Sequence, residues 1–173
     1  MEILKQKIRS IPDFPKPGIL FYDVTTLLRD PDGFRASIDA MCAPYEKSAI
    51  DLIAGIESRG FILGAAMADR LGAGFVPIRK KGKLPGRTVR EEYALEYGTD
   101  CLEVHDDAIQ PGQRVLIVDD LLATGGTAAA VLNLVRGLGG DVLGLAFLVE
   151  LDFLGGRGRF EGGRLPVVVN YSE

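Results

Sequence analysis

Hydrophobic residues along the chain gather in short apolar runs, several of which precede segments in which apolar residues recur at helical spacing. The clearest run is Val-Leu-Ile-Val at residues 115–118, which is typical of a buried strand in a parallel sheet. Further strands are predicted at residues 51–56, 74–78, 142–149 and 165–169, and helices at residues 61–71 and 128–136. This alternation predicts an α/β fold, a mostly parallel twisted sheet with flanking helices and right-handed crossovers.

The N-terminal part and one internal segment depart from this alternation. Apolar residues within 2–11 recur at helical spacing and predict a helix. Prolines at positions 12, 15 and 17 then exclude regular structure, and residues 19–24 are predicted to be extended. Another helix is predicted to start at Asp32-Gly33, and the polar, aromatic residues 84–106 are predicted to form a long loop or a hairpin.

Composition narrows the class of protein. The 173 residues are enough for one domain with a sizeable core. No apolar run approaches the roughly 20 residues that span a bilayer, and a secretory apolar segment is lacking, so no membrane partner is expected. The net charge of −4 argues against a nucleic-acid partner. Cys42 and Cys101 lack metal-ligand spacing, which suggests free thiols in the cytoplasm, and the single histidine, His105, argues against zinc.

The chemistry is concentrated just after residues 115–118. Asp119 and Asp120 follow at the predicted end of the strand, and Ala-Thr-Gly-Gly-Thr at residues 123–127 leads into a predicted helix. Backbone N–H groups at a helix start bind phosphate, and glycines let the backbone approach it closely. Two carboxylates suit neutral vicinal hydroxyls, such as those of a ribose. The segment lacks the lysine of a P-loop and the glycine spacing of a dinucleotide fingerprint.

An acidic pair alone is common in α/β domains, but the combination with Thr-Gly-Gly-Thr is specific. It resembles the 5-phosphoribosyl-1-pyrophosphate (PRPP) loop of type I phosphoribosyltransferases. The resemblance implies that Asp119 and Asp120 bind the ribose hydroxyls. It also implies that the 5′-phosphate is bound by Ala123, Thr124, Gly125, Gly126 and Thr127.

Two further polar clusters follow predicted strands, and ligands of such sheets bind beyond the carboxyl ends of the strands. These clusters are Glu57-Ser58-Arg59 and the basic residues from Arg79 to Lys83. Alone, the basic cluster would be interpreted as solvated surface, although pyrophosphate needs several cationic donors. In the family the Ser-Arg turn binds pyrophosphate, and the peptide before the serine is often cis, as expected for Glu57–Ser58. The implied pyrophosphate-binding residues are Ser58, Arg59, Arg79, Lys80 and Lys83.

Other motifs are similar to those of the adenine phosphoribosyltransferases. They include Gly-Lys-Leu-Pro-Gly at residues 82–86, Tyr-Ala-Leu-Glu-Tyr-Gly at residues 93–98 and the proline-rich residues 9–18. The resemblance covers nearly the whole chain. It implies a single phosphoribosyltransferase domain, residues 1–173, with an N-terminal hood that binds the base (residues 1–30) and a mobile catalytic loop (residues 82–106).

Position 123 bears on the choice of base. Phosphoribosyltransferases for 6-oxopurines generally have an aspartate there, which hydrogen-bonds purine N7. Ala123 cannot do so, which argues against hypoxanthine and guanine. Tyr22 stands where many relatives have Arg or Lys. The resemblance implies adenine contacts from Leu20, Phe21, Arg59 and Leu121, although core packing would equally account for Phe21 and Leu121.

The resemblance implies transfer of the phosphoribosyl group of PRPP to adenine in purine salvage, giving AMP and pyrophosphate. Mg²⁺ is expected as the cofactor, held mainly by PRPP and by no dedicated ligand cluster. Glu96 on the mobile loop is the candidate for proton transfer to or from the purine, and Arg59 for stabilising the leaving group. A homodimer is also expected, because the family is commonly dimeric.

Two alternatives stay open. The chain could be a phosphoribosyltransferase for another base, such as xanthine, orotate or uracil. It could also be a PRPP-binding regulator that binds DNA or RNA, although it has no appended helix-turn-helix and no strongly basic face.

Overall fold

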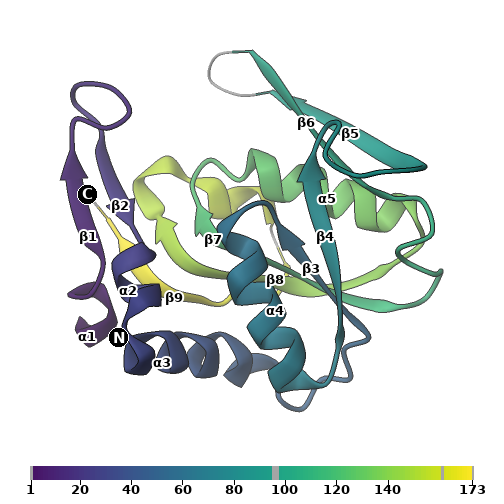
Figure 1. The fold of residues 1–173 in the computed structure, drawn as a ribbon, viewed down its shortest axis with the longest axis horizontal. Coiled ribbons are helices and arrows are strands. Elements are labelled where there is room, and N and C mark those ends of the chain that lie inside the picture. Colours follow the sequence, from purple (N-terminus) through teal and green to yellow (C-terminus); the bar gives the residue numbers. More distant parts are fainter. Residues whose placement is uncertain (1, 95–97, 161, 173) are drawn as a thin grey trace.

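The computed structural model describes residues 2–94, 98–160 and 162–172. Its centre is a seven-stranded sheet with the order β5-β6-β4-β3-β7-β8-β9 (Figure 1). Five adjacent strands pair in parallel, which confirms the predicted α/β architecture. These strands are β4 (Gly74–Lys80), β3 (Leu52–Ile56), β7 (Arg114–Leu122), β8 (Asp141–Leu151) and β9 (Val167–Tyr171).

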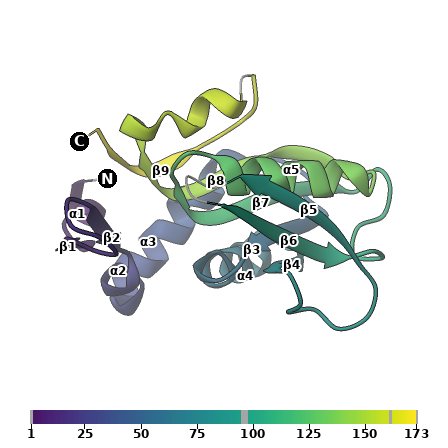
Figure 2. The ribbon, with the colours of Figure 1, turned by 90° about the horizontal axis from the view of Figure 1, so that it is seen from above.

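Helices cover both faces of the parallel strands. Helices α3 (Pro31–Cys42) and α4 (Arg59–Leu71) lie on one side of the sheet, and α5 (Gly126–Gly137) lies on the other (Figure 2). In β7, Leu116 and Val118 belong to the core on the α3–α4 side, whereas Ile117 belongs to the core on the α5 side. The continuous apolar run of β7 therefore reflects burial of the strand on both faces.

The N-terminal segment forms a separate antiparallel pair, and here one sequence prediction is wrong. The expected helix over residues 2–11 ends early, as α1 (Glu2–Lys5), and is followed by β1 (Arg9–Pro12). Strand β1 pairs with β2 (Leu20–Asp23), and a proline disfavours helical geometry in the residue before it. The helical spacing arose because Leu4 and Ile8 are both buried. A short helix after β2, α2 (Thr25–Arg29), was not predicted.

Asp23 stabilises the end of the β1–β2 strand pair through hydrogen bonds. Its carboxylate accepts hydrogen bonds from the Thr25 hydroxyl at 2.7 Å and from Arg9 Nε at 3.1 Å. The Thr25 hydrogen bond and then the Arg9 pair lower the pKa of Asp23 to about 2. The carboxylate therefore stays ionised at neutral pH and keeps β2 in register beside β1.

The described residues within 84–106 form the two strands of a hairpin. Strands β5 (Thr88–Ala94) and β6 (Thr99–His105) are antiparallel, and β6 pairs with β4 at the edge of the sheet. The buried carboxylate of Glu103 accepts hydrogen bonds from the backbone N–H groups of Lys83 and Leu84, both at 3.0 Å. This carboxylate fixes the turn that leads from β4 into the hairpin.

Strand β7 continues further than its apolar run predicts. Asp119 and Asp120 lie inside the strand, which ends at Leu122, and not after its end. Pairing with β3 stops at Val118, whereas pairing with β8 continues to Leu122. The acidic pair thus lies where one edge of β7 is open, at the carboxyl end of the shorter neighbouring strand.

The remaining elements are three short 3-10 helices: η1 (Ala43–Tyr45), η2 (Asp152–Leu154) and η3 (Gly156–Phe160). Cys42 and Cys101 are both free thiols and both are buried. Among the described residues, no helix has the length and apolar character needed to cross a membrane.

Candidate active site

The segment between β7 and α5 has the geometry of an anion-binding loop. Gly125 precedes the helix with a φ of 78°, and α5 begins at Gly126. The first N–H groups of a helix have no partner within it and carry the positive end of its dipole. A cavity of about 70 Å³ lies beside them. It is lined by Asp119, Leu121, Leu122, Ala123, Thr124, Gly125, Gly126, Thr127, Ala128 and Phe147.

The loop is supported from behind by η3, which the sequence analysis did not connect with it. Arg159 Nε donates a hydrogen bond of 2.7 Å to the carbonyl oxygen of Thr124. A Cβ atom on Gly125 would come within 2.8 Å of the Gly156 carbonyl oxygen and 3.1 Å of the Phe160 ring. A left-handed φ and this close packing both require glycine at position 125.

The acidic pair is buried, and Arg59 is its counter-ion. Arg59 Nε donates to a carboxylate oxygen of Asp120, and the backbone N–H of Asp120 donates to Asp119 Oδ1 at 2.8 Å. Gly60 allows the close approach, since a Cβ atom there would lie 2.8 Å from Asp119 Oδ1. Burial, followed by the neighbouring Asp120 carboxylate, raises the pKa of Asp119 well above its ordinary value. The pair therefore resists carrying two full negative charges unless a ligand or cation compensates them.

The predicted base-binding residues approach the acidic pair through Arg59. The Arg59 guanidinium lies 5.9 Å from the Phe21 ring, which makes an edge contact with Phe14 at 5.1 Å between centroids. Leu20 is exposed, at 45% of its full area, and Leu121 lines the loop cavity. On this side of the site, the Phe21 ring offers an aromatic face and the Arg59 guanidinium a cation to a flat aromatic base.

Tyr22, the residue that departs from the family pattern, faces away from Phe21. Its ring stacks on Tyr171, with centroids 3.7 Å apart. Successive side chains of a strand point to opposite sides, so Phe21 and Tyr22 serve different surfaces.

The predicted pyrophosphate-binding residues lie at the ends of β3 and β4. The peptide between Glu57 and Ser58 is cis, as expected, and Ser58 is exposed. Arg79 and Lys80 lie in the last two positions of β4 rather than after it. Glu57 holds this end, because its carboxylate accepts from Arg79 Nε at 3.2 Å and from the Lys80 N–H at 3.0 Å.

The three cations predicted to bind pyrophosphate at this end, Arg79, Lys80 and Lys83, have different partners. The Lys80 ammonium donates to Asp100 at 2.8 Å, and Arg79 also donates to the Lys83 carbonyl oxygen at 3.2 Å. Within the described part of the chain, the Lys83 ammonium has no ion-pair partner, so it is open to an incoming anion.

Glu96, the candidate proton-transfer residue, lies outside the described residues. Its position along the chain is bracketed by Tyr93 and Asp100, which face each other across the hairpin. Tyr93 and Asp100 were not singled out from the sequence. The sequence feature that could have pointed to Tyr93 and Asp100 is that they flank the segment that contains Glu96.

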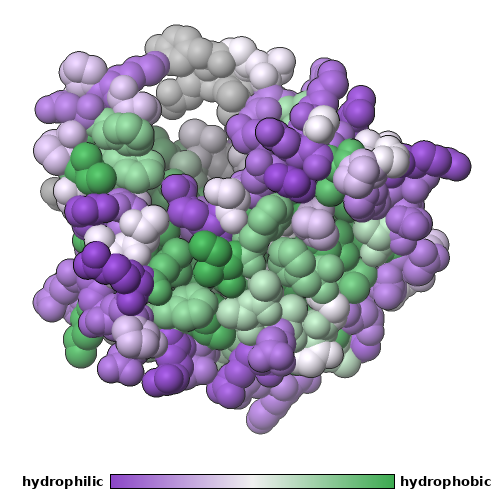
Figure 3. Space-filling view, in the orientation of Figure 1, coloured by the Kyte–Doolittle hydropathy of each residue, from purple (hydrophilic) through white to green (hydrophobic). Residues whose placement is uncertain are grey.

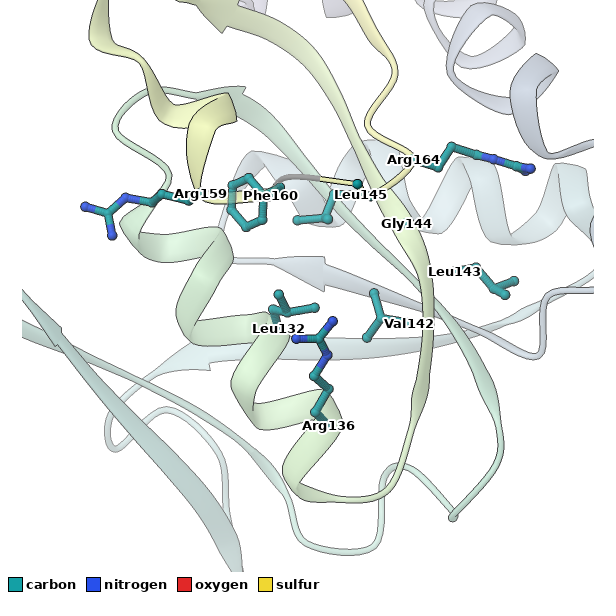
Figure 4. A pocket seen from close by; sticks show the side chains of 11 residues that line it. Leu132, Arg136, Val142, Leu143, Gly144, Leu145, Arg159, Phe160 and Arg164 are labelled. Atoms are coloured by element: carbon teal, nitrogen blue, oxygen red, sulfur yellow. The ribbon is translucent and has the colours of Figure 1, made fainter.

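A larger hollow of about 380 Å³ lies elsewhere, between α5, β8 and the segment after η3 (Figure 4). It contains none of the predicted site residues. Arg159 and Arg164 extend away from it in opposite directions, and only the Arg136 guanidinium lies over its centre. Its cations therefore do not converge on one point, unlike the groups around the loop cavity.

Comparison with known proteins supplies the family. Residues 23–159 match the family model described as the phosphoribosyl transferase domain. The chain is 62% identical over 172 residues to the adenine phosphoribosyltransferase of Acidobacterium capsulatum, covering 99% of this chain and 95% of that one.

Solved structures agree with this match. The crystal structure of adenine phosphoribosyltransferase from Rhodothermus marinus has a TM-score of 0.94 and 54% identity, covering 98% of this chain and 97% of that one. The Saccharomyces cerevisiae enzyme, in complex with adenine and an imino-altritol bisphosphate, has a TM-score of 0.90 and 43% identity, covering 96% and 97%. By this domain match and these full-length relatives, the chain belongs to the phosphoribosyltransferase family, among the adenine phosphoribosyltransferases.

Proposed function

We propose that the chain is a pentosyltransferase that transfers the 5-phosphoribosyl group of PRPP to adenine, giving AMP and pyrophosphate in purine salvage. One observation carries the proposal: Asp119 and Asp120 are buried at the open edge of β7, and two residues separate Asp120 from the loop at residues 123–127 that leads into α5. Identity of 62% to an adenine phosphoribosyltransferase supports adenine as the base. Two buried free thiols are in keeping with a cytoplasmic location.

The ribose 5-phosphate part of PRPP would bind along the end of β7. The first N–H groups of α5, with the Thr124 and Thr127 hydroxyls, would hold the 5′-phosphate. Asp119 and Asp120 would accept hydrogen bonds from the 2′- and 3′-hydroxyls. Because Asp120 is already paired with Arg59, the ribose must compete for this carboxylate, and the guanidinium then becomes available to the pyrophosphate.

The reaction would proceed by attack of adenine N9 on C1′ as pyrophosphate leaves, through a sugar that resembles an oxocarbenium ion. The negative charge of the acidic pair stabilises such a cation from the ribose side. The leaving group would be stabilised by Ser58, Arg59, Arg79, Lys80 and Lys83.

A magnesium ion is expected with PRPP, and the donor set is compatible with one held mainly by the substrate. Among the described residues, no three His, Cys, Asp or Glu side chains gather into a metal site. Mg²⁺ usually binds substrate phosphates with one or two carboxylates, and the acidic pair offers carboxylate oxygens beside the ribose. When bound, Mg²⁺ neutralises charge on the leaving pyrophosphate. Chelation by EDTA should therefore abolish turnover, and full activity in excess EDTA would contradict this role.

The hood and the hairpin complete the proposed site. Phe21 and Leu121 would contact the adenine ring, with backbone groups of Leu20 and Arg59 at its edge. Glu96 would move a proton to or from the purine, and the hairpin over residues 82–106 would exclude water from the activated sugar.

A panel of bases tests the proposed substrate. Each of adenine, hypoxanthine, guanine, xanthine, orotate and uracil is given with PRPP and Mg²⁺, and pyrophosphate release is followed. We expect kcat/KM for adenine to exceed that of every other base by at least about 100-fold, because a site that hydrogen-bonds one base edge leaves polar groups unpaired with another. Equal turnover of another base would contradict the proposal.

The same panel addresses the regulator alternative. A chain that binds PRPP but releases no pyrophosphate with any base, and that retains DNA or RNA in a filter-binding assay, would be a regulator. Turnover with adenine and no retained nucleic acid is the result expected of the enzyme.

A homodimer is part of the proposal. Apolar surface gathers on the face of the molecule that α4 and β4 occupy in Figure 1 (Figure 3). Ile62 of α4 is 47% exposed, and the same helix begins with Arg59 of the site. An exposed apolar patch is typical of an interface between subunits. Light scattering that gives the mass of a single 18.6 kDa chain at assay concentrations would contradict this assignment.

A further inference from the structure

The β5–β6 hairpin is joined to the phosphate-binding loop by a chain of side-chain hydrogen bonds that the proposed reaction does not use. The Thr127 hydroxyl donates to the Tyr93 hydroxyl at 3.4 Å. The Tyr93 hydroxyl donates in turn to Asp100 Oδ2 at 3.3 Å. The Lys80 ammonium donates to the same oxygen at 2.8 Å. The chain thus connects the start of α5, the hairpin and the basic cluster at the end of β4.

Tyr93 is well placed to set the position of the hairpin. It pairs with Asp100 in the β5–β6 register, and the residues between them include Glu96. Its ring also lies over the start of α5, because a Cβ atom on Gly126 would come within 3.7 Å of Tyr93 Cδ2. Further along, Asn133 of α5 donates a hydrogen bond of 2.8 Å to Glu91 of β5. Strand β5 therefore lies along α5, and Tyr93 and Ala94 make its contacts at the start of the helix, beside the loop at residues 123–127.

The protonation states of Tyr93 and Asp100 decide which group donates and which accepts in this chain of hydrogen bonds. Hydrogen bonding by Lys80 is the main cause that lowers the pKa of Asp100, so this carboxylate is ionised and accepts. Burial is the main cause that raises the pKa of Tyr93, so its hydroxyl keeps its proton and donates. Asp100 Oδ1 is occupied by the backbone N–H of Cys101 at 2.8 Å, which leaves Oδ2 to Tyr93 and Lys80.

The number of hydroxyl protons available links this chain of hydrogen bonds to ligand binding. Thr127 and Tyr93 have one hydroxyl proton each. If Thr127 donates its proton to a phosphate oxygen, it can no longer donate to Tyr93, and Tyr93 must donate either to Thr127 or to Asp100. Both hydroxyl contacts are also longer than the common O–H···O distance of about 2.7–2.8 Å, so they have room to shorten when the partners change.

We infer that Tyr93 is a positioning residue that couples phosphate binding at Thr127 to the placement of the hairpin and, through Asp100, to the Lys80 ammonium. The inference rests on the proposed function in one respect, the binding of the substrate 5′-phosphate by the loop at residues 123–127. A bound phosphate accepts the hydrogen bond of the Thr127 hydroxyl, Tyr93 turns to donate to Thr127, and Asp100 Oδ2 is left with Lys80 alone. Strands β5 and β6 are thereby held against the occupied loop.

Removal of one hydroxyl tests the inference. Tyr93→Phe keeps the ring on α5 and deletes only the middle of the chain. We expect kcat/KM for PRPP to fall about 5- to 10-fold while KM for adenine changes less than 2-fold, because the lost contact responds to the phosphate and not to the base. Tyr171→Phe, the same chemical change on β9, is expected to match the unmodified protein.

Two further measurements separate coupling from ordinary packing. Ribose 5-phosphate, which offers the loop a phosphate without pyrophosphate, should raise Tm less in Tyr93→Phe than in the unmodified protein. The double variant Tyr93→Phe/Asp100→Asn should be no worse than the more affected single variant, because both changes break one chain.

The outcomes that overturn the inference are distinct from a failure of the proposed function. Absence of AMP formation by the unmodified protein would contradict the proposed function. With an active unmodified protein, an equal Tm shift by ribose 5-phosphate in Tyr93→Phe would overturn the coupling. So would an equal loss of kcat/KM in Glu91→Ala, which removes the hydrogen bond between the hairpin and Asn133 of α5 and leaves the Thr127–Tyr93–Asp100 hydrogen bonds intact.

Discussion

Glu96→Gln is expected to lower kcat with adenine by about 100-fold or more, while the melting temperature stays the same. A positioned proton donor or acceptor typically contributes about 10²- to 10⁴-fold to a rate, and glutamine has the size of glutamate without its titrating proton. Glu96 follows Tyr93 in the sequence by three residues, and the Tyr93 hydroxyl contacts Thr127 of the loop at residues 123–127. Steady-state kinetics with saturating PRPP measure the change.

Glu92→Gln is the matched control. Glu92 lies on β5 of the same hairpin and is exposed, so the same chemical change there should leave kcat within about 2-fold. A loss of less than a few-fold in Glu96→Gln would show that proton transfer by this residue is not part of the mechanism.

Gly125→Ala is expected to lower kcat/KM for PRPP by about 100-fold. A left-handed backbone costs a residue with a Cβ atom roughly 1–2 kcal/mol. The new atom would also lie 2.8 Å from the Gly156 carbonyl oxygen and 3.0 Å from Arg159 Cδ. The loop must therefore shift away from η3, and a displacement of about 1 Å in a positioning group can cost about 10²-fold in rate.

The control for this substitution is Gly158→Ala. Gly158 belongs to η3 as well, but its φ is not in the left-handed region and a Cβ atom there would meet nothing within 4 Å. We expect Gly158→Ala to keep normal kinetics. Gly125→Ala should also weaken the binding of ribose 5-phosphate, and unchanged binding would contradict the assignment of the phosphate to this loop.

The sequence predicted those parts of the fold that depend on local patterns. Strands β3, β7 and β8 have consecutive apolar residues, whereas a half-buried strand would alternate apolar and polar residues. The helices α3, α4 and α5 follow from the helical spacing of apolar residues and from residues typical of a helix start. The N-terminal segment was wrongly predicted as one helix because Leu4 and Ile8 are buried at helical spacing. Strand β1 nevertheless begins at Arg9, directly after Ile8. Pairing with β2, a tertiary effect, decides the conformation there.

The candidate site was predictable as a set of residues but not as an arrangement. Nothing local indicates that pairing of β7 with β3 stops at Val118, and this is what leaves Asp119 and Asp120 at an open edge inside the strand. The Arg59–Asp120 ion pair joins residues 61 positions apart, and the Thr127–Tyr93 contact joins residues 34 apart. Such partners are fixed only when the sheet and its hairpin are assembled.

The most direct test of the account is a crystal structure with AMP bound. We expect the 5′-phosphate in the turn formed by residues 123–127, the ribose hydroxyls on Asp119 and Asp120, and the adenine ring beside Phe21. A phosphate bound at any other place, such as the hollow beside Arg136, would contradict it.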